Sequence, residues 1–530
     1  MIPYKGLVGS LSYHQCPGVV TESKEYEDGL RALKRFSSLN DGIFRSISRK
    51  KSCQKEEQAV EIAVGESSSA EEDLAPSPSS WYQSICSYVR LRLNGRLWQE
   101  LSGAFGGLGS FLPAVLALSL YNETDFGTTL LFSGVFNVVT GLVFKIPIPV
   151  QPMAAILVAA LSPNPLTVPQ IMAAGLITAF AMGILGITGW MEFLYHRIPL
   201  PVVRGVMLGE GLMTAIKSVT YILEYQDLAK MQNLGQRSWL GIKGLLVPVT
   251  ILIFLGIVSG ARKSSEENGE KISDPVVNND DKSVREALLS TSGDREEQEA
   301  EESTWRRAIL NIPTALLIIL IGLALAIAYD PQTIGNLQLG PSPIKFVKIS
   351  YEDWSVGLLR AAVYQIPVSI LSSVISTSTL SSDYFPGEKV TPSSLCLSVW
   401  VMNLLGCWFG AVPVCHGAVG LAGQYKFGAR SGLSMMMLGM IKLLLGLLFG
   451  SSVSWILTQY PESLFGVLLL WSGLELALVC QARNTPLDLL VMLAVVVVSI
   501  GSSTAFSTTL GFVCGLVLYL VLKLHQWLKK

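Results

Sequence analysis

Two apolar segments, one in each half of the chain, are interrupted by residues that break a helix. Residues 145–156 read KIPIPVQPMAAI, and residues 411–423 read AVPVCHGAVGLAG. Each joins a short extended run to small residues that would form only half of a membrane helix. Irregular backbone is tolerated at membrane depth only where it is buried in protein or lines a cavity. Two such interruptions, in corresponding places of the two halves, indicate the binding site of a secondary transporter.

The apolar stretches of the chain are long enough to cross a lipid bilayer. Half of the 530 residues are apolar and only 15% are charged, and about 20 apolar residues span a ~30 Å hydrocarbon core. We therefore expect an all-α polytopic membrane protein embedded in a bilayer. Eight scattered cysteines and four histidines indicate neither a disulfide framework nor a metal site. We expect no cofactor, no metal ion and no nucleic-acid partner.

We predict fourteen membrane segments, two of which are the interrupted ones. Lys and Arg gather at alternate ends of the segments, and this bias places both termini in the cytoplasm. Seven segments fall in each half, so two similar halves would be inverted in the membrane. Gly205 and Gly211 of the fifth segment compare with Gly466 and Gly473 of the twelfth. The predicted segments are residues 101–121, 126–144, 147–162, 170–195, 200–222, 239–260, 306–328, 354–382, 393–411, 412–425, 431–452, 463–480, 486–500 and 503–524.

These segments define the predicted domains. Residues 96–328 form the first inverted repeat, and residues 354–525 form the second. Residues 1–95 are polar and serine-rich without an apolar run, which is typical of a disordered tail, here in the cytoplasm. Residues 262–305 are strongly acidic and form a disordered cytoplasmic insert within the first repeat.

The two half-helices predict an anion site. Each would start near mid-membrane and present free N–H groups and the positive end of its dipole to the interior. Where two such starts meet head-on, the gap binds an anion without a lysine. Ala154, Gly417 and Ala418 are small enough for a solute to approach the backbone, and Gln151 and His416 supply directional hydrogen bonds. The alternative for the first segment is that its prolines only kink a packed helix.

Other polar residues lie within the predicted spans. Gln365 belongs to a hydroxyl-rich span with a helix-breaking proline, and such a face lines a site or makes a close helix contact. Glu210 and Glu475 are the only acids well inside spans, and both should face the interior. Proton coupling or gating explains them, and so does a structural bridge to Arg204 or to a backbone group. The sequence contains no nucleophile–base arrangement of the kind that enzymes use, so we expect no enzyme.

Several motifs resemble the plant and fungal molybdate transporter family of the sulfate permease superfamily. They are PIPVQPMAA at 147–155, LPVVRGVMLGEGL at 200–212, QIPVSILSSV at 365–374, PVCHGAVGLAGQYKFGARSG at 413–432 and GLELA at 473–477. The resemblance covers about residues 95–525. It implies a uracil-permease type fold of seven plus seven inverted spans, divided into a core and a gate domain, and it implies uptake or intracellular transfer of molybdate. It also implies that no cytoplasmic regulatory domain follows the last span, since only a few residues remain there.

Three places depart from the family pattern. Residues 412–423 read VPVCHGAVGLAG where the family often has MPCCHGAGGLAG. Residues 106–110 read GGLGS where the family usually has GDLGT, so the acid is missing while Ser110 keeps a hydroxyl near the site. Glu210 stands where the family commonly has a neutral polar residue. It and Glu475 are therefore the candidates for coupling or gating. The predicted substrate-binding residues are Ser110, Gln151, Met153, Ala154, Gln365, His416, Gly417 and Ala418.

The resemblance and the residues together predict a secondary active transporter of molybdate, proton-coupled and working by alternating access. The anion would lie between the starts of the half-helices, and Gln365 would close the site. A sulfate or broader oxyanion permease and a receptor that binds without transport are the alternatives. The plasma membrane and vacuolar or other endomembranes both stay open. Relatives of this fold often dimerise, so a homodimer stays open as well.

Overall fold

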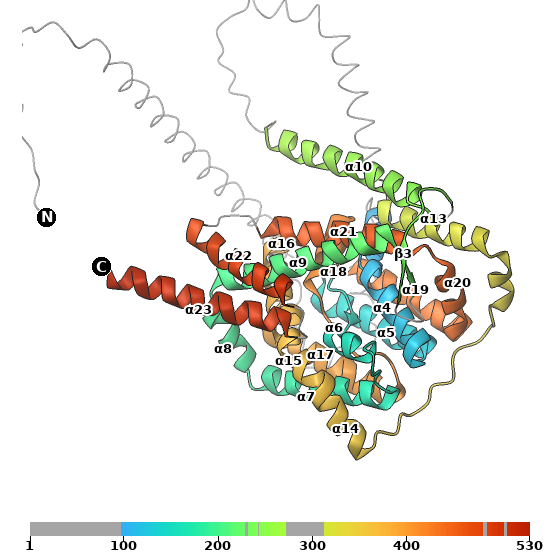
Figure 1. Cartoon of the computed structure of the whole chain (residues 1–530), viewed down its shortest axis with the longest axis horizontal. Helices are drawn as coiled ribbons and strands as arrows, with labels where there is room; N and C mark the ends of the chain where they lie inside the picture. The colour runs from blue at the N-terminus through green and yellow to red at the C-terminus, as the bar shows by residue number, and fades with distance from the viewer. Residues whose placement is uncertain are drawn as a thin grey trace, which may run out of the picture. The chain divides into compact units, whose positions relative to one another are not determined.

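The computed structural model describes residues 97–227, 232–241, 243–271, 312–480, 485–502 and 506–529, and most of these are helical (Figure 1). The predicted tail and most of the predicted acidic insert lie outside these residues. The first half contains α3 (Leu97–Gly106), α4 (Leu108–Asn122), α5 (Phe126–Phe144), β1 (Gln151–Pro152), α6 (Ala154–Ala160), α7 (Val168–Ile187), α8 (Trp190–Arg197), α9 (Leu200–Leu223), β2 (Glu224–Asp227), β3 (Gln232–Gln236), α10 (Leu246–Lys271), α13 (Thr314–Tyr329) and η2 (Pro331–Asn336).

The second half repeats this pattern of long and half-length helices. It contains α14 (Tyr351–Gly357), η3 (Leu358–Ala362), α15 (Val363–Val368), η4 (Ser369–Ser376), α16 (Thr377–Tyr384), α17 (Pro392–Gly406), η5 (Cys407–Phe409), β4 (Val414–Cys415), α18 (Ala418–Lys426), α19 (Leu433–Phe449), η6 (Gly450–Ser452), α20 (Val453–Gln459), α21 (Glu462–Val479), α22 (Pro486–Gly501) and α23 (Ser507–Leu528). The predicted all-α architecture is confirmed, and the four short strands are its only regular extended segments among the described residues.

Helices of membrane-spanning length dominate the described residues. Eight of them are long and apolar enough to cross a membrane, and a ninth span results if α3 and α4, which are bent by 43° relative to each other, count as one. α13, α22 and the apolar part of α10 are shorter, and α6 and α18 are half-helices. The prediction of a multi-pass membrane protein is therefore confirmed. Of the fourteen predicted segments, the described residues confirm eight as full-length spans, or nine if the bent pair α3 and α4 counts as one.

The eighth predicted segment is a continuous helix with two wider stretches. It runs from Tyr351 to Tyr384 and includes the π-helical stretches η3 and η4. Between them, α15 carries Gln365 and Pro367. Proline lacks an N–H and clashes with the preceding turn of an α-helix, and π-helical turns are frequent at functional sites. This stretch packs against the half-helix α6.

The two interrupted segments meet at the centre of the fold. β1 and β4 pair as antiparallel strands, with Gln151 opposite Cys415 and Pro152 opposite Val414. Asn403 holds β4 from the side, because its amide accepts from the Val414 N–H at 2.7 Å and donates to the Val414 oxygen at 2.6 Å. Extended backbone at membrane depth is thus paired, with β4 buried and β1 partly buried, as the cost of leaving it unpaired requires.

The packing of the helices has two-fold symmetry. α5 packs on α19, and α7 packs on α17. α5 corresponds to α17 in the other half of the chain and α7 corresponds to α19, so the two contacts are equivalent when the halves are exchanged. α9 pairs with its own counterpart α21, where Gly211 and Gly473 each lie against the other's carbonyl oxygen. Because β1 and β4 are also counterparts and run antiparallel, the axis is perpendicular to them. The inverted repeat is therefore confirmed.

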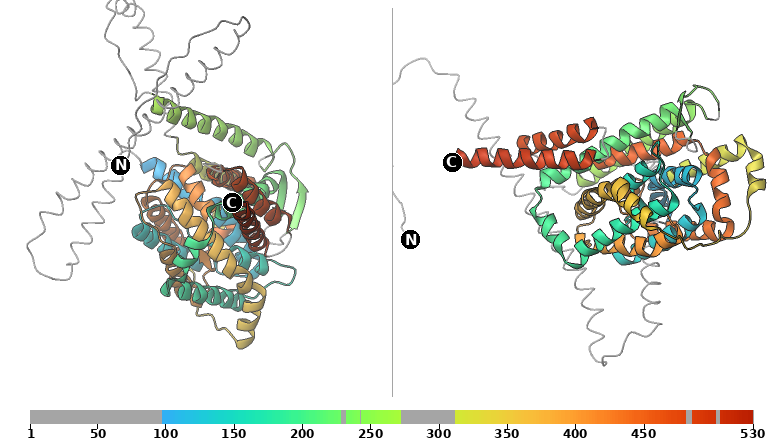
Figure 2. Two further views of the ribbon diagram at one scale, coloured as in Figure 1. Left: turned by 90° about the vertical axis from the view of Figure 1, so that its left-hand side faces the viewer. Right: turned by 60° about the horizontal axis from the view of Figure 1, so that its bottom comes forward.

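The helices divide into two groups. α9, α10, α21, α22 and α23 pack mainly on one another, and we call them the gate group (Figures 1 and 2). α3 to α7 and the helices from α14 to α19 surround the paired strands, and we call them the core group. The two groups meet where α9 contacts η4 and where α21 contacts α4 and α18.

Candidate functional site

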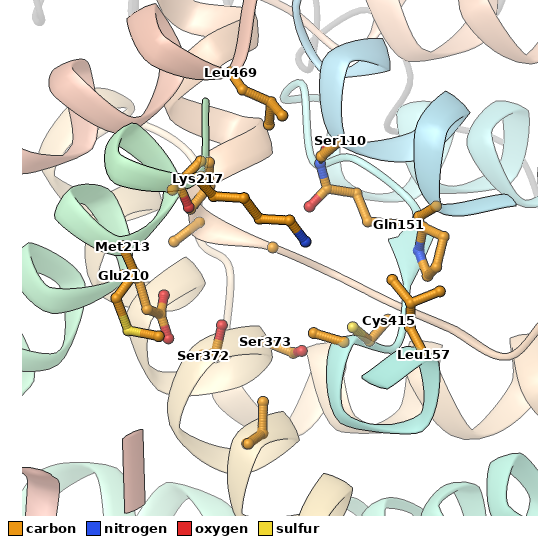
Figure 3. Close-up of a pocket in the computed structure, with 18 of the residues that line it drawn as sticks. Ser110, Gln151, Leu157, Glu210, Met213, Lys217, Ser372, Ser373, Cys415 and Leu469 are labelled. Carbon is orange, nitrogen blue, oxygen red and sulfur yellow. The ribbon is translucent and has the colours of Figure 1, made fainter. Parts of the chain in front are cut away.

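A cavity of about 380 Å³ lies between the two groups of helices. α4, the starts of α6 and α18 and the stretch around Gln365 line it from the core group, and α9 lines it from the gate group (Figure 3). Its volume falls in the usual range for small-molecule sites, about 300–1,000 Å³. Of the predicted substrate-binding residues, Ser110, Gln151, Ala154, Gln365, His416, Gly417 and Ala418 line the cavity, and Met153 does not.

Gln151 extends from β1 across the start of α18. Its Nε2 donates to the Ser110 hydroxyl at 2.6 Å, and that hydroxyl donates to the Gly107 oxygen at 3.1 Å. The amide also lies directly over Gly417 and Gly420, where any Cβ atom would stand 2.3 Å or less from it. The glycines of the second half-helix therefore make room for a side chain of the first one. Figure 3 shows the Gln151 amide beside Ser110 at the edge of the cavity.

Gln365 caps the first half-helix. Its Oε1 accepts from the backbone N–H groups of Ala155 at 2.8 Å and Ile156 at 3.3 Å, and its Nε2 donates to Ser369. The side chain is fully buried. The start of α6 is thus already satisfied by the protein. α18 differs, since no side chain caps its N-terminus in the described part of the chain.

His416 lines the cavity, and both nitrogens of its ring are hydrogen-bonded to other groups of the protein. Nδ1 lies 3.0 Å from the Pro149 oxygen and Nε2 lies 3.0 Å from the Ser398 hydroxyl. A carbonyl oxygen only accepts, so Nδ1 carries the hydrogen and Nε2 accepts from Ser398. The Phe144 ring packs edge-on against the imidazole. The predicted hydrogen bond from this ring to a solute is therefore absent from this arrangement.

Met153 occupies the position before α6 and belongs to the apolar core. Its side chain is 1% exposed, and its backbone N–H donates to the Pro413 oxygen at 2.9 Å. Met153 does not line the cavity in this arrangement, and its contact with a solute stays a prediction. Ala154, Gly417 and Ala418 line it as small residues beside the backbone.

The two predicted acids have different surroundings. Glu210 lines the cavity from α9 and is hydrogen-bonded to Ser372, while its Oε1 is buried and has no hydrogen-bond partner among the described residues. Glu475 lies outside the cavity, where it pairs with Lys426 at 2.9 Å and accepts from the Tyr384 hydroxyl at 3.4 Å. The predicted bridge to Arg204 does not form with either acid, since the ion pair of Arg204 is with Asp383, at 3.9 Å.

Lys217 is a cavity residue that the sequence reasoning missed. Figure 3 shows its amine reaching from α9 into the middle of the cavity. Glu210, Met213, Thr214 and Lys217 all line the cavity, and their spacing of three, four and seven residues places them on one helix face. A lysine within a predicted span is by itself a candidate functional residue. That signal was present in the sequence.

The chemistry of the lining suits an anion. The lining contains one amine, hydroxyl and amide groups, and the uncapped start of a helix. The amine, hydroxyl and amide groups donate hydrogen bonds, and the helix start is the positive end of a dipole. The single carboxyl group of the lining, Glu210, is the exception.

Comparison with known proteins assigns the chain to a family. A family model described as "Molybdate transporter of MFS superfamily" matches residues 99–213 and 357–476. Molybdate transporter 2 of Arabidopsis thaliana is 46% identical, over 84% of this chain and 91% of the relative. The chain belongs to the molybdate transporter family. Molybdate transporter 1 of the same plant is 41% identical over 81% of this chain and 89% of the relative, and molybdate transporter 1 of Chlamydomonas reinhardtii is 33% identical over 79% and 90%.

Solved structures of anion transporters are more distant from this member of the molybdate transporter family. Murine Slc26a9 in the inward-facing state matches with a TM-score of 0.49 and 14% identity, over 88% of this chain and 75% of that one. The transmembrane domain of the cyanobacterial bicarbonate transporter BicA matches with a TM-score of 0.44 and 13% identity, over 80% and 98%.

The matched blocks of the molybdate transporter family contain most of the cavity. Ser110, Gln151, Gln365 and Gly417 fall within them. The first block ends at residue 213, so Lys217 lies just beyond it.

Proposed function

We propose that this protein carries molybdate across a membrane as a secondary transporter that works by alternating access. The cavity between the core and gate groups is the observation that carries the proposal, together with membership of the molybdate transporter family. A cavity at the boundary of two helix groups opens to one side or the other when one group rocks against the other. In this proposal the inverted repeat provides one arrangement that is open to each side.

In this proposal the anion lies against the start of α18. That helix begins at Ala418 without a side-chain cap in the described residues, whereas Gln365 already occupies the start of α6. Ser110 and Gln151 lie beside the open helix start and offer adjustable hydrogen bonds. The site is therefore one-sided, unlike the symmetric gap that the sequence predicts.

Discrimination between molybdate and sulfate has to come from size, because both are tetrahedral dianions. A cavity of about 380 Å³ with movable amide and hydroxyl groups accommodates the larger ion together with water. A site that binds the two ions equally would make the protein a broader oxyanion permease.

We further propose that Glu210 couples transport to protons. A charged carboxylate in the same cavity repels a dianion, and protonation removes this repulsion, so proton and anion would enter together. The other titratable residues that line the cavity are Lys217, Tyr221, Cys415 and His416, and the His416 ring is held by Pro149 and Ser398. Uptake should rise as the pH on the side of entry falls. Glu210→Gln, which imitates the protonated form, should keep uptake and lose most of this pH dependence.

Uptake of labelled molybdate into proteoliposomes tests the proposal. Uptake that persists with sulfate in large excess supports a selective molybdate transporter, and uptake that sulfate abolishes supports the broader permease. Binding of molybdate without uptake or counterflow would show a receptor and contradict the proposal. A pH gradient in the same vesicles, with the wild type and Glu210→Gln side by side, tests proton coupling separately.

A further inference from the structure

Lys217 is a lysine at membrane depth without a counterion in the described part of the chain. It forms no hydrogen bond, ion pair or ring contact with the residues that the structure describes, and part of its side chain is exposed. The exposed surface faces the cavity, because the amine points into it (Figure 3). A charge at this depth is costly unless it is paired or faces water. The geometry therefore leaves a place for an anion that is not part of the protein.

Glu210 does not fill that place. It lies on the same face of α9 but seven residues earlier, which separates the two positions by about 10 Å along the helix axis. Met213 and Thr214 line the cavity between them. The carboxyl group contacts Ser372 of the core group instead. The Lys217 amine and the Glu210 carboxyl group thus lie on the same face of α9, at opposite ends of its cavity-lining stretch.

The side of the cavity across from α9 belongs to the core group. Gln151 and the start of α18 lie there, with Gly417 and Ala418 in the lining. An ion that contacts both the Lys217 amine and this helix start would touch the gate group and the core group at once.

We propose that the Lys217 amine is the charged contact of the transported oxyanion, and that the bound ion bridges gate helix α9 to core half-helix α18. This inference rests on the proposed function and adds the residue that recognises charge. It places the charge on the gate group and the neutral donors on the core group. Occupancy of the site then holds the two groups together.

The charge of the ligand provides the sharpest test. Coulomb energy is proportional to ligand charge, so loss of the amine should weaken a dianion more than a monoanion of the same shape. We would measure the affinity of purified protein for molybdate and for perrhenate, a tetrahedral monoanion. Lys217→Gln should weaken molybdate binding roughly a hundredfold and perrhenate binding only about tenfold, since half the Coulomb energy corresponds to the square root of the fold-change.

Matched variants separate charge from packing. Lys217→Arg keeps the charge and should keep the preference for the dianion. Lys345→Gln removes an exposed lysine outside the cavity and should change neither affinity. Equal weakening of both anions by Lys217→Gln, or no weakening, would overturn the inference. A wild type that binds neither anion would instead remove the proposed function.

Hydrogen exchange of the wild type tests the bridge without any variant. Molybdate should slow exchange in α9 around residues 213–221 as well as at the start of α18. Protection of α18 alone would show that the anion does not touch the gate group and would overturn the bridge even if Lys217→Gln failed to fold.

Discussion

Gly417 keeps the Gln151 amide in its place. A Cβ atom there would stand 2.3 Å from Gln151 Oε1, and every other atom within 4 Å belongs to the same amide group. The φ of Gly417 is −149°, which any residue adopts, so the obstacle is only this contact. Gly417→Ala should displace the flexible amide, lower molybdate uptake about tenfold and leave the protein folded. Gly256→Ala, in open space on α10, is the control. Normal uptake by Gly417→Ala would show that the amide position is unimportant.

We expect His416 to contribute to stability rather than to binding. Its ring joins the Pro149 oxygen to the Ser398 hydroxyl, and both partners belong to the core group. His416→Ala leaves these groups without a partner, at about 1–3 kcal/mol for each buried group. We expect a lower melting temperature in detergent with an unchanged KM for molybdate. A raised KM at an unchanged melting temperature would make His416 a ligand after all.

At the scale of single elements, the cap of α6 separates folding from binding. Gln365→Glu keeps an acceptor for the N–H groups of Ala155 and Ile156 and adds a negative charge at a helix start, which the dipole stabilises. The same charge borders the cavity and repels an anion. Gln365→Glu should therefore fold like the wild type and bind molybdate at least tenfold more weakly. Gln365→Leu, which removes the acceptor, should be the less stable of the two by thermal denaturation.

The half-helices were predictable because proline and glycine interrupt an apolar pattern that would otherwise continue. The same signal located Gln151, Gln365 and the glycine at 417 near one another. The direction of the His416 ring was not predictable, since it depends on partners at Pro149 and Ser398 that only the folded chain brings together. Lys217 was predictable from its seven-residue spacing to Glu210, because this spacing places both side chains on one face of a helix.

At the scale of the whole described unit, charged side chains join the core group to the gate group along one face of the molecule. Lys426 and Glu475 pair at 2.9 Å, and Arg204 and Asp383 pair at 3.9 Å. Each pair joins a core helix to a gate helix. Tyr384 adds its hydrogen bond to Glu475 and stacks on Tyr425. α9 begins and α16, α18 and α21 end at this face, so these contacts close it.

Alternating access requires this face to open, so weakening its ion pairs should shift the protein toward that state. Partly exposed pairs contribute about 0.2–1 kcal/mol each, so the two pairs together contribute about 0.4–2 kcal/mol. A change of this size alters a two-state ratio roughly two- to thirtyfold. Asp383→Asn combined with Glu475→Gln should therefore increase labelling of cavity residue Cys415 by a membrane-impermeant thiol reagent, applied to each side of the vesicle in turn. Labelling of Cys415 should increase only when the reagent is applied to one side of the membrane. Adding Cys415→Ala to the same double variant measures how much of the labelling comes from the other cysteines. Unchanged labelling from both sides would mean that packing of the helices, rather than charge, keeps this face closed.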